Sequence, residues 1–489
     1  MRARDLNLHL PEDPDRPRYL QVAAALAEAI AQGRLAPGTA LPGVRELARM
    51  LGLNRNTVLA ALGELKAQGL VESREREGIF VREGAPRTPA AAPGPPTRPG
   101  FDLPDHFDPP TEPVPNLLDL SEPMADVRLA PSEALARAYS RALRQQGGGL
   151  LARGDARGTL RLREGLSAHL GEARGLVVDP ERILITGGVR MGLALVTQVL
   201  VGTAGGVVAL EDPLRPWIRE VLRQAAPVDL VPVPVDAEGM AVEALPGLLG
   251  GRTPSLVLVS PACQDPTGTA LAPARRQLLL QFAREHRFPV VELELEPAYD
   301  RAPSPPPLAA EDPTGQVLHL GGFSRTVAPG FRLGYLTGAG QLVAALAKAR
   351  QRLDWQGDRV LEWALADLME EGEYGRHLRR LRRSAEERRA ALGRVLVEEL
   401  GADLLCPASD LGMGLWVQGR GRLAAPPAFQ HWLGLALRRG VRAAPGQPWH
   451  LDGRPLAATR LAFSAHEPAE LKAAAWRLAR ALEDLQGLV

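Results

Sequence analysis

The segment ILITGGVRMGLALVTQVL, residues 183–200, changes its hydrophobic pattern within two residues. It begins with an apolar, isoleucine-containing run that is typical of a buried strand, and it continues as an apolar helical pattern. Gly187 and Gly188 lie between the two parts. A strand, a glycine pair and a helix in this order resemble an anion cradle, in which backbone amides at the helix start meet a phosphate. The segment therefore predicts an α/β domain.

Four other segments have the same character, a buried-looking strand followed by turn residues. They are GVVALEDPLRPW (206–217), SLVLVSPACQDPTGT (255–269), PVVELELEPAYD (289–300) and VLHLGGFSRT (317–326). Helical patterns lie between them, for example over residues 273–287, and a glycine-punctuated turn leads into a helix over 150–170. Strands that alternate with helices favour a mostly parallel sheet covered on both faces.

Composition excludes several classes of protein. A length of 489 residues suits two or three domains, and 45% hydrophobic with 24% charged residues is typical of globular proteins. The net charge of +1 means that any nucleic acid must be bound by a local patch. Cys263 and Cys406 form no metal-binding or disulfide pattern, so no metal site is expected. Because we find no signal-like or membrane-spanning apolar run, we expect a cytoplasmic protein without membrane contact.

A proline-rich stretch divides the chain. Residues 83–115 include 11 prolines among 33 residues. Proline fixes φ and removes a backbone donor, so this stretch favours an extended, polyproline-like spacer that buries no core. The sequence therefore predicts a small domain over 1–82, a linker over 83–115 and a large domain over 116–489.

Residues 1–82 combine three helical patterns with two short strands. YLQVAAALAEAIAQG, PGVRELARMLG and NRNTVLAALGELKAQG predict the helices, the third of them capped by Asn54, and LVESREREGIFVRE predicts a hairpin. The inner face of the first helix is expected to hold Leu20, Ala23, Ala24, Ala27 and Ile30. Helix, helix, short turn, helix and hairpin is the pattern of a winged helix-turn-helix, an α+β fold.

The stretch GRLAPGTALPGVRELARMLGLNRNTVLAALGELKAQGLVE, residues 33–72, resembles the DNA-binding domain of the GntR family of transcriptional regulators. The resemblance implies that Arg45, at the start of one helix, and Arg55 with Thr57, at the start of the recognition helix, contact double-stranded DNA. Residues in the first turn of a groove-bound helix reach base edges, and Arg binds guanine through two hydrogen bonds. Further expected DNA contacts are Arg49, Asn54 and Asn56.

The wing departs from the family pattern, since it reads EGIFV over 77–81 where the family usually has GxGTFV. Glu75 and Glu77 alternate with Arg74 and Arg76. Acidic side chains repel phosphate, so the wing is not expected to contribute contacts.

Residues 116–489 are similar to a fold-type I aminotransferase, and the complete arrangement resembles the MocR subfamily of GntR regulators, as do the segments 372–392 and 460–465. In GGFSRTVAPGFRLGY, residues 321–335, the resemblance puts Arg325 where the family has the lysine that forms an aldimine with pyridoxal phosphate. Only a primary amine forms that bond, and a permanently protonated guanidinium does not. The chain has three lysines, Lys66, Lys348 and Lys472, and none has the motif context of a replacement. We therefore expect no catalytic residue and no enzyme activity.

The same resemblance implies a degenerate cofactor site. Leu293 and Leu295 stand in the places of the Asp and Tyr that hold the cofactor ring, and a shifted pairing of Glu296 with Tyr299 is the alternative. Cys263 stands where histidine is common. Arg215 replaces the residue that stacks on the ring, Arg332 has the spacing of a phosphate clamp, and Arg460 matches a substrate-carboxylate ligand. We therefore expect an anion site formed by Arg325, Arg332, Arg215 and Arg460. The alternative is that the retained arginines Arg332 and Arg460 only anchor loops.

The sequence thus predicts a DNA-binding transcriptional regulator that binds its operator as a head-to-tail homodimer. The aminotransferase-like domain is expected to dimerise the protein or to sense a small anionic effector, without Schiff-base catalysis and without a bound cofactor. The alternatives are a regulator that binds pyridoxal phosphate noncovalently and an active aminotransferase. The arginine-rich segment 376–389 is either a second DNA-contacting face or a helix that faces solvent or a second subunit.

Overall fold

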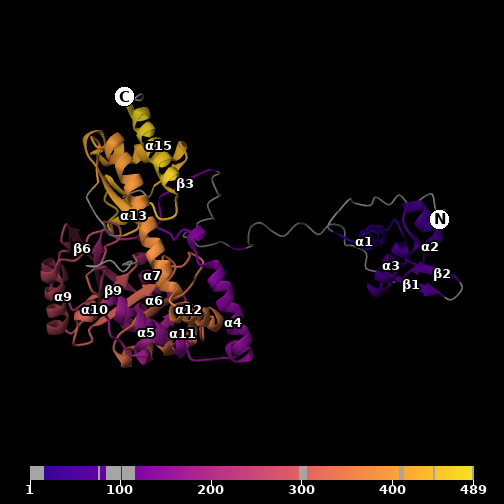
Figure 1. Cartoon of the computed structure of the whole chain (residues 1–489), viewed down its shortest axis with the longest axis horizontal. Helices are drawn as coiled ribbons and strands as arrows, with labels where there is room; N and C mark the ends of the chain where they lie inside the picture. The colour runs from indigo at the N-terminus through magenta and orange to yellow at the C-terminus, as the bar shows by residue number, and fades with distance from the viewer. Residues whose placement is uncertain are drawn as a thin grey trace. The chain divides into compact units, whose positions relative to one another are not determined.

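The computed structural model of the chain describes residues 16–74, 77–83, 101, 116–296, 305–406, 412–443 and 447–486. Within it the chain forms two compact units, Met1–Glu112 and Pro113–Val489 (Figure 1). Each unit has a hydrophobic core of its own. Most of the expected spacer over 83–115 lies outside the described residues, as do Glu75, Arg76 and Tyr299.

The first unit is a winged helix-turn-helix, as predicted. Its elements are α1 (Arg18–Ala31), α2 (Val44–Leu51), α3 (Arg55–Ala67), β1 (Val71–Arg74) and β2 (Gly78–Val81). The two strands pair antiparallel, with Val71 opposite Val81. The Leu41 N–H donates to the Ile79 carbonyl and the Val81 N–H to the Thr39 carbonyl, so the segment before α2 adds a short edge to the wing.

The predicted inner face of α1 is partly wrong. Ala23 and Ile30 are buried as expected, but Leu20, Ala24 and Ala27 are only half-buried. The core is instead built by Val22, Ala25, Leu26 and Ala29. Six alanines among fourteen residues give this helix little contrast between its faces, so packing against α3 decides which side is covered.

Asn54 caps α3 as expected. Its backbone is extended and its side-chain oxygen accepts the Asn56 N–H at 3.0 Å, which satisfies one of the unpaired amides at the helix start. We predict that Asn54→Ala lowers the local stability of α3 by about 1 kcal/mol. Hydrogen exchange of the α3 amides measures this loss, with Asn56→Ala as the control. Equal exchange in the two variants would contradict the capping role.

The second unit is built on an eight-stranded sheet in the order β4-β11-β10-β9-β8-β5-β6-β7. The strands are β4 (Ile183–Thr186), β5 (Gly206–Asp212), β6 (Val228–Asp236), β7 (Gly239–Met240), β8 (Leu256–Val259), β9 (Val290–Glu294), β10 (Val317–Gly322) and β11 (Gly334–Thr337). Strands β10, β9, β8, β5 and β6 run parallel, whereas β11 is antiparallel to both of its neighbours and β7 to β6. The sheet is therefore mostly parallel, as predicted, and β6, β7 and β11 were missed.

Helices cover both faces of this sheet. Successive residues of a strand point to opposite faces, and apolar residues on both faces need to be covered. Leu184, Leu258 and Leu320 pack with α6 (Val189–Leu200), α7 (Pro216–Ala225) and α11 (Gly340–Leu353). On the opposite face, residues such as Ile185 and Val257 belong to the clusters that contain α5 (Leu160–Arg174), α8 (Leu245–Leu249), α9 (Pro273–His286) and α12 (Arg359–Glu370). Two further helices of this part are α4 (Ser132–Leu151) and α10 (Leu308–Glu311).

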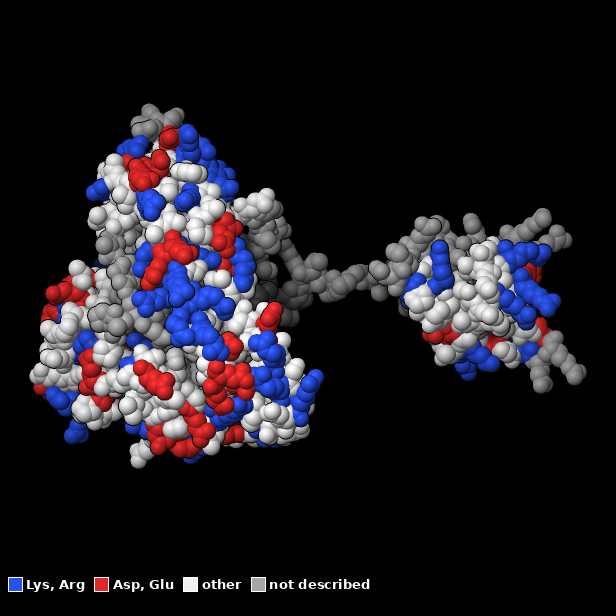
Figure 2. Space-filling view, viewed as in Figure 1, with Lys and Arg blue, Asp and Glu red and all other residues white. Residues whose placement is uncertain are grey.

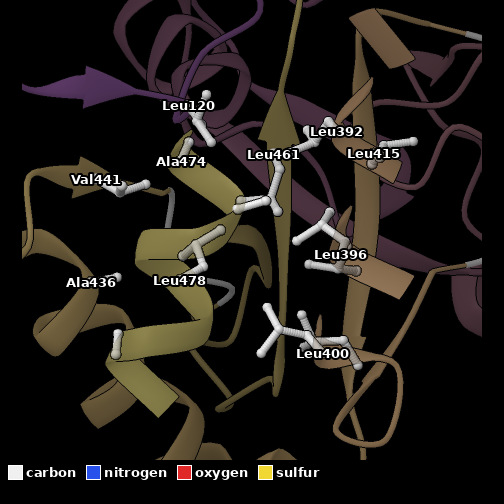
Figure 3. Packing of buried hydrophobic residues seen from close by; sticks show 14 of the residues in the cluster. Leu120, Leu392, Leu396, Leu400, Leu415, Ala436, Val441, Leu461, Ala474 and Leu478 are labelled. Atoms are coloured by element: carbon white, nitrogen blue, oxygen red, sulfur yellow. The ribbon is translucent and has the colours of Figure 1, made fainter. Parts of the chain in front are cut away.

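A smaller layer completes the second unit. Its strands β12 (Leu404–Leu405), β13 (Gly414–Gly419) and β15 (Ala458–Ala462) form an antiparallel sheet, and β3 (Leu118–Asp119) pairs with β14 (Val441–Arg442). The long helix α13 (Glu373–Leu400) packs there with α14 (Pro426–Arg438) and α15 (Pro468–Gln486). Figure 3 shows leucines from α13, β13, β15 and α15 meeting in this core. None of the described helices is long and apolar enough to cross a membrane.

Candidate ligand site and DNA-binding face

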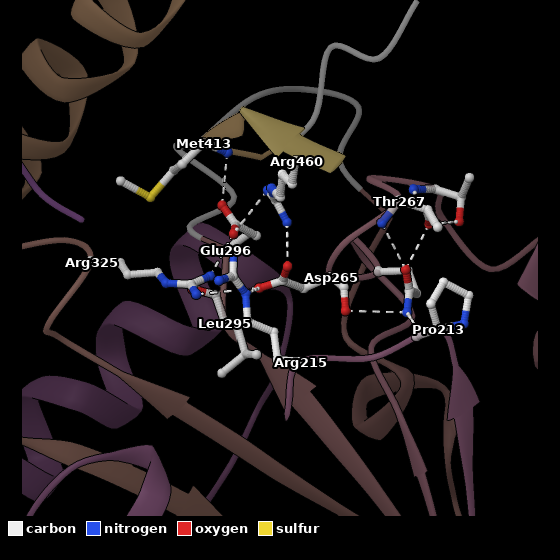
Figure 4. A network of polar contacts seen from close by, with 11 residues as sticks. Pro213, Arg215, Asp265, Thr267, Leu295, Glu296, Arg325, Met413 and Arg460 are labelled. Carbon is white, nitrogen blue, oxygen red and sulfur yellow. Dashed lines mark hydrogen bonds and ion pairs between the residues drawn. The ribbon is translucent and has the colours of Figure 1, made fainter. Parts of the chain in front are cut away.

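The candidate ligand site lies where several parallel strands end. Arg325 follows β10, Glu296 follows β9, Asp265 follows β8 and Arg215 immediately precedes α7. Arg460 reaches the same point from β15 in the smaller sheet (Figure 4). Carboxyl ends of parallel strands form the usual ligand-binding edge of such sheets, so the fold itself brings these distant residues together.

These five side chains form one network of ion pairs (Figure 4). Asp265 Oδ2 lies 2.8 Å from Arg215 Nε and 3.3 Å from Arg325 Nη2, and Oδ1 lies 2.6 Å from Arg460 Nη1. Glu296 Oε1 pairs with Arg325 Nη1 and, at 3.1 Å, with Arg460 Nη2. The other oxygen of Glu296 accepts the Met413 N–H at 2.8 Å. Three guanidiniums thus share two carboxylates.

The network favours the charged forms of Asp265 and Arg460, whereas burial lowers the pKa of Arg215. Burial by itself would raise the pKa of Asp265, but Arg215, Arg460 and Arg325 hold it well below its usual range. Burial opposes the charge of Arg460, yet Asp265 and Glu296 keep its pKa above the ordinary value. Cys263 beside them has a pKa raised to about 12 by burial and by the Glu296 charge, so its thiol stays protonated at neutral pH. Neither a guanidinium nor a protonated thiol is a competent nucleophile.

A cavity of about 200 Å³ lies against the network. It is lined by Glu122, Pro123, Met124, Val189, Arg190, Arg215, Trp217, Glu294, Leu295, Gly322, Ser324, Arg325, Pro329 and Arg332. A Cβ built at Gly188 would meet the Arg332 guanidinium at 3.5 Å, so that guanidinium lies beside the start of α6. No hydrogen bond or ion pair to Arg332 occurs among the described residues, and the Arg190 guanidinium lies 4.8 Å from the centre of the Trp217 ring. The cavity therefore keeps cationic groups beside free helix-start amides.

The carboxylate of Glu294 lines the same cavity and is bound by Arg174 and His319. Its Oε1 lies 3.1 Å from Arg174 Nε, and its Oε2 lies 3.2 Å from His319 Nε2. The other ring nitrogen of His319 lies 3.1 Å from Glu292. Burial opposes protonation of His319, but the two glutamates outweigh it and raise its pKa. An acidic side chain therefore lines the cavity together with Arg190 and Arg332.

The first unit presents a separate polar face. Arg45 in the first turn of α2 and Arg55 in the first turn of α3 are exposed, as are Arg49, Asn54 and Asn56, and Thr57 is half-buried. No ion pair to Arg45, Arg49 or Arg55 occurs within the described part of the chain. Arg74 of the wing, by contrast, pairs with Glu72 at 2.9 Å and stacks over Phe80.

Known proteins resemble the chain over both units. Residues 18–81 match the model of the bacterial regulatory proteins of the gntR family, and residues 117–478 match that of aminotransferase class I and II. The uncharacterized HTH-type transcriptional regulator YisV of Bacillus subtilis is 29% identical over 92% of this chain and 93% of its own. The probable rhizopine catabolism regulatory protein MocR of Rhizobium meliloti is 28% identical over 83% of each chain. The chain is a MocR-type regulator of the GntR family.

Its large unit also belongs to the class I and II aminotransferases by sequence and by fold. The crystal structure of LysN, the alpha-aminoadipate aminotransferase of Thermus thermophilus, superimposes with a TM-score of 0.69 at 27% identity, over 77% of this chain and 94% of LysN. The regulator family binds DNA, so this MocR-type regulator is a DNA-binding protein.

The structure separates the four arginines of the predicted anion site. Arg215, Arg325 and Arg460 meet around Asp265, and Arg460 is fully buried and does not line the cavity. Arg332 lines the cavity without such a pairing. Leu293 packs into the core. Glu296, the described member of the shifted pairing, is bound to Arg325 and Arg460, and its partner Tyr299 lies outside the described residues. The sequence did not identify four residues of the site, namely Asp265, Glu294, Arg190 and Trp217. For Asp265, the acidic residue inside the motif SPACQDPTG was a signal that could have been used.

Proposed function

We propose that this MocR-type regulator binds operator DNA in the cytoplasm as a head-to-tail homodimer and that its aminotransferase-like unit senses a small anion without transaminating it. One observation carries the proposal. The guanidinium of Arg325, which by resemblance takes the place of the family's lysine, is bonded to Glu296 and Asp265. A monomeric mass at micromolar concentration would contradict the dimer.

The residues present do not fit covalently held pyridoxal phosphate. Arg325 has no free lone pair for an imine. Lys348 on α11 and Lys472 on α15 are exposed residues that do not line the cavity, and Lys66 belongs to the first unit. The carboxylates of Asp265 and Glu296 are already neutralised by arginines of the chain. We therefore derive no catalytic step at this site.

The ligand class follows from the groups that line the cavity without an ion pair. Arg332, Arg190 and the start of α6 suit a phosphate or another compact dianion. The Ser324 hydroxyl lines the cavity too, but it donates to the Phe331 carbonyl at 3.2 Å. Both terminal nitrogens of the buried Arg460 already pair with Asp265 and Glu296, so an α-carboxylate would have to displace an internal ion pair to bind them. A phosphorylated metabolite is thus favoured over a free amino acid.

Noncovalent binding of pyridoxal phosphate is the second candidate. It is favoured by the same Arg332 and α6 start, and by the Glu294 carboxylate that lines the cavity. A coenzyme held in this way would be removed by dialysis.

Titration calorimetry of the full chain with inorganic phosphate, pyridoxal phosphate and a panel of phosphorylated and carboxylate metabolites tests the sensing role. We predict that Arg332→Gln weakens binding of the best ligand by about tenfold to a hundredfold, because a charge-assisted hydrogen bond is lost. Arg223→Gln, which removes an exposed arginine of α7, is the matched control. Silence across the whole panel would leave dimerisation as the sole role of this unit.

A further inference from the structure

A row of exposed arginines lies along the first half of α13. Arg376, Arg379, Arg380 and Arg383 follow the spacing i, i+3, i+4 and i+7, which places them on one face of the helix. All four are exposed. We call these four residues the α13 arginine stripe. Figure 2 shows basic side chains gathered in the region where α13 faces the viewer in Figure 1.

The neighbouring arginines of α13 are used within the unit, whereas the stripe is only partly paired. Arg388 is buried against Asp126, and Arg382 pairs with Glu386 at 3.1 Å. Within the stripe, Arg376 pairs with Glu373 at 3.1 Å, and Arg380 hydrogen-bonds His377. No ion pair or hydrogen bond to Arg379 or Arg383 occurs among the described residues.

Such a stripe is unfavourable for the isolated helix. Arginines at i, i+3 and i+4 repel one another, and the two unpaired guanidiniums lie within one another's reach at i and i+4. The repulsion is relieved when a partner places anionic oxygens opposite them. Guanidiniums bind phosphate oxygens through paired hydrogen bonds, so a row of phosphates is the most suitable partner.

We propose that the α13 arginine stripe binds the phosphate backbone of DNA that flanks the operator. The inference rests on DNA binding by the first unit, which supplies the specific contact. Four residues over two helical turns extend about 10 Å, which faces about three successive phosphates of one strand at 3.4 Å rise per residue of DNA. The chain between residues 83 and 116 spans at most about 120 Å, so its length permits both units to reach one DNA molecule.

The test compares two lengths of DNA at several salt concentrations. One duplex of about 20 bp carries only the paired half-sites selected by the full-length protein from a random library, and the other extends the same sequence to about 60 bp. The variant is the double substitution Arg379→Gln with Arg383→Gln. The control, Arg223→Gln with Arg284→Gln, removes two exposed arginines from α7 and α9 and changes the net charge equally.

We expect the stripe variant to bind the long duplex about tenfold to a hundredfold more weakly near 0.1 M salt. The slope of the logarithm of the association constant against the logarithm of the salt concentration should be shallower by about 2 per protomer. It should bind the short duplex as the unaltered protein does, and the control should bind both normally. Equal affinity of variant and unaltered protein for the long duplex would overturn the proposal, as would an equal loss on both lengths. A change of the dimer mass in the variant would assign the stripe to a subunit contact instead. If the variant still binds the short duplex normally, operator recognition by the first unit is intact, and a loss on the long duplex is then due to the stripe alone.

Discussion

Arg55→Ala should reduce operator affinity by about 10² to 10⁴-fold, to the level of unrelated DNA. Arg55 is the first residue of α3, it is exposed, and no acidic side chain pairs with it within the described chain. A bidentate contact with a base contributes about 1–3 kcal/mol of discrimination, and a dimer makes it at both half-sites. Fluorescence anisotropy with the DNA upstream of the chain's own gene and with a scrambled duplex measures both affinity and preference.

Arg34→Ala is the matched control for this experiment. Arg34 lies in the turn after α1, where its side chain hydrogen-bonds Gln32 at 2.9 Å. Its loss removes the same charge from the same unit and should leave sequence preference unchanged. An Arg55→Ala protein that kept both its affinity and its preference for the operator would disprove the assignment of α3 as the recognition helix.

Asp265→Asn should lower the free energy of unfolding of the large unit by about 3–5 kcal/mol, because it leaves three buried or half-buried guanidiniums with one carboxylate. The lowered pKa of Asp265 gives the pH dependence. Its contribution is fully present above the unfolded-state pKa of about 3.9 and is lost as the pH falls towards its folded-state pKa. The difference between variant and unaltered protein should therefore be constant near neutral pH and shrink in acid.

Tryptophan fluorescence during denaturant unfolding measures this loss selectively, since all seven tryptophans lie between Trp217 and Trp476 in the large unit. Asp229→Asn is the control, because Asp229 forms an exposed pair with Arg252 and its loss should cost less than about 1 kcal/mol. If the two variants were equally stable, the ion-pair network would not be a structural element of the site.

Local patterns were sufficient to predict much of the fold. The glycine pair before α6, the Asn54 cap and the Gly52 stop of α2 depend on neighbouring residues, so the sequence contains them directly. The parallel strands β5, β8, β9 and β10 were visible because they are largely buried and form apolar runs. The parallel strand β6 was missed, since its buried residues alternate with exposed ones and two prolines interrupt its apolar pattern. The short β11 was missed, since GYLT is too brief to be distinguished from the loop before it.

The site was harder to predict because its members are joined only by the folded chain. Arg215 and Arg460 are 245 positions apart in the sequence, yet both pair with Asp265. The resemblance to aminotransferases located four of the arginines, but it could not show that internal carboxylates occupy three of them. For the same reason Arg332, which has no such partner among the described residues, could not be separated from the others in advance.

The most direct test of the account is to mix the purified protein with one equivalent of pyridoxal phosphate, reduce it with borohydride and measure the intact mass. Because the guanidinium of Arg325 forms no imine, we predict an unchanged mass after reduction and, in a parallel sample without borohydride, the loss of any yellow colour on dialysis. A stoichiometric pyridoxyl adduct that peptide mapping placed on any side chain of the large unit would contradict the account.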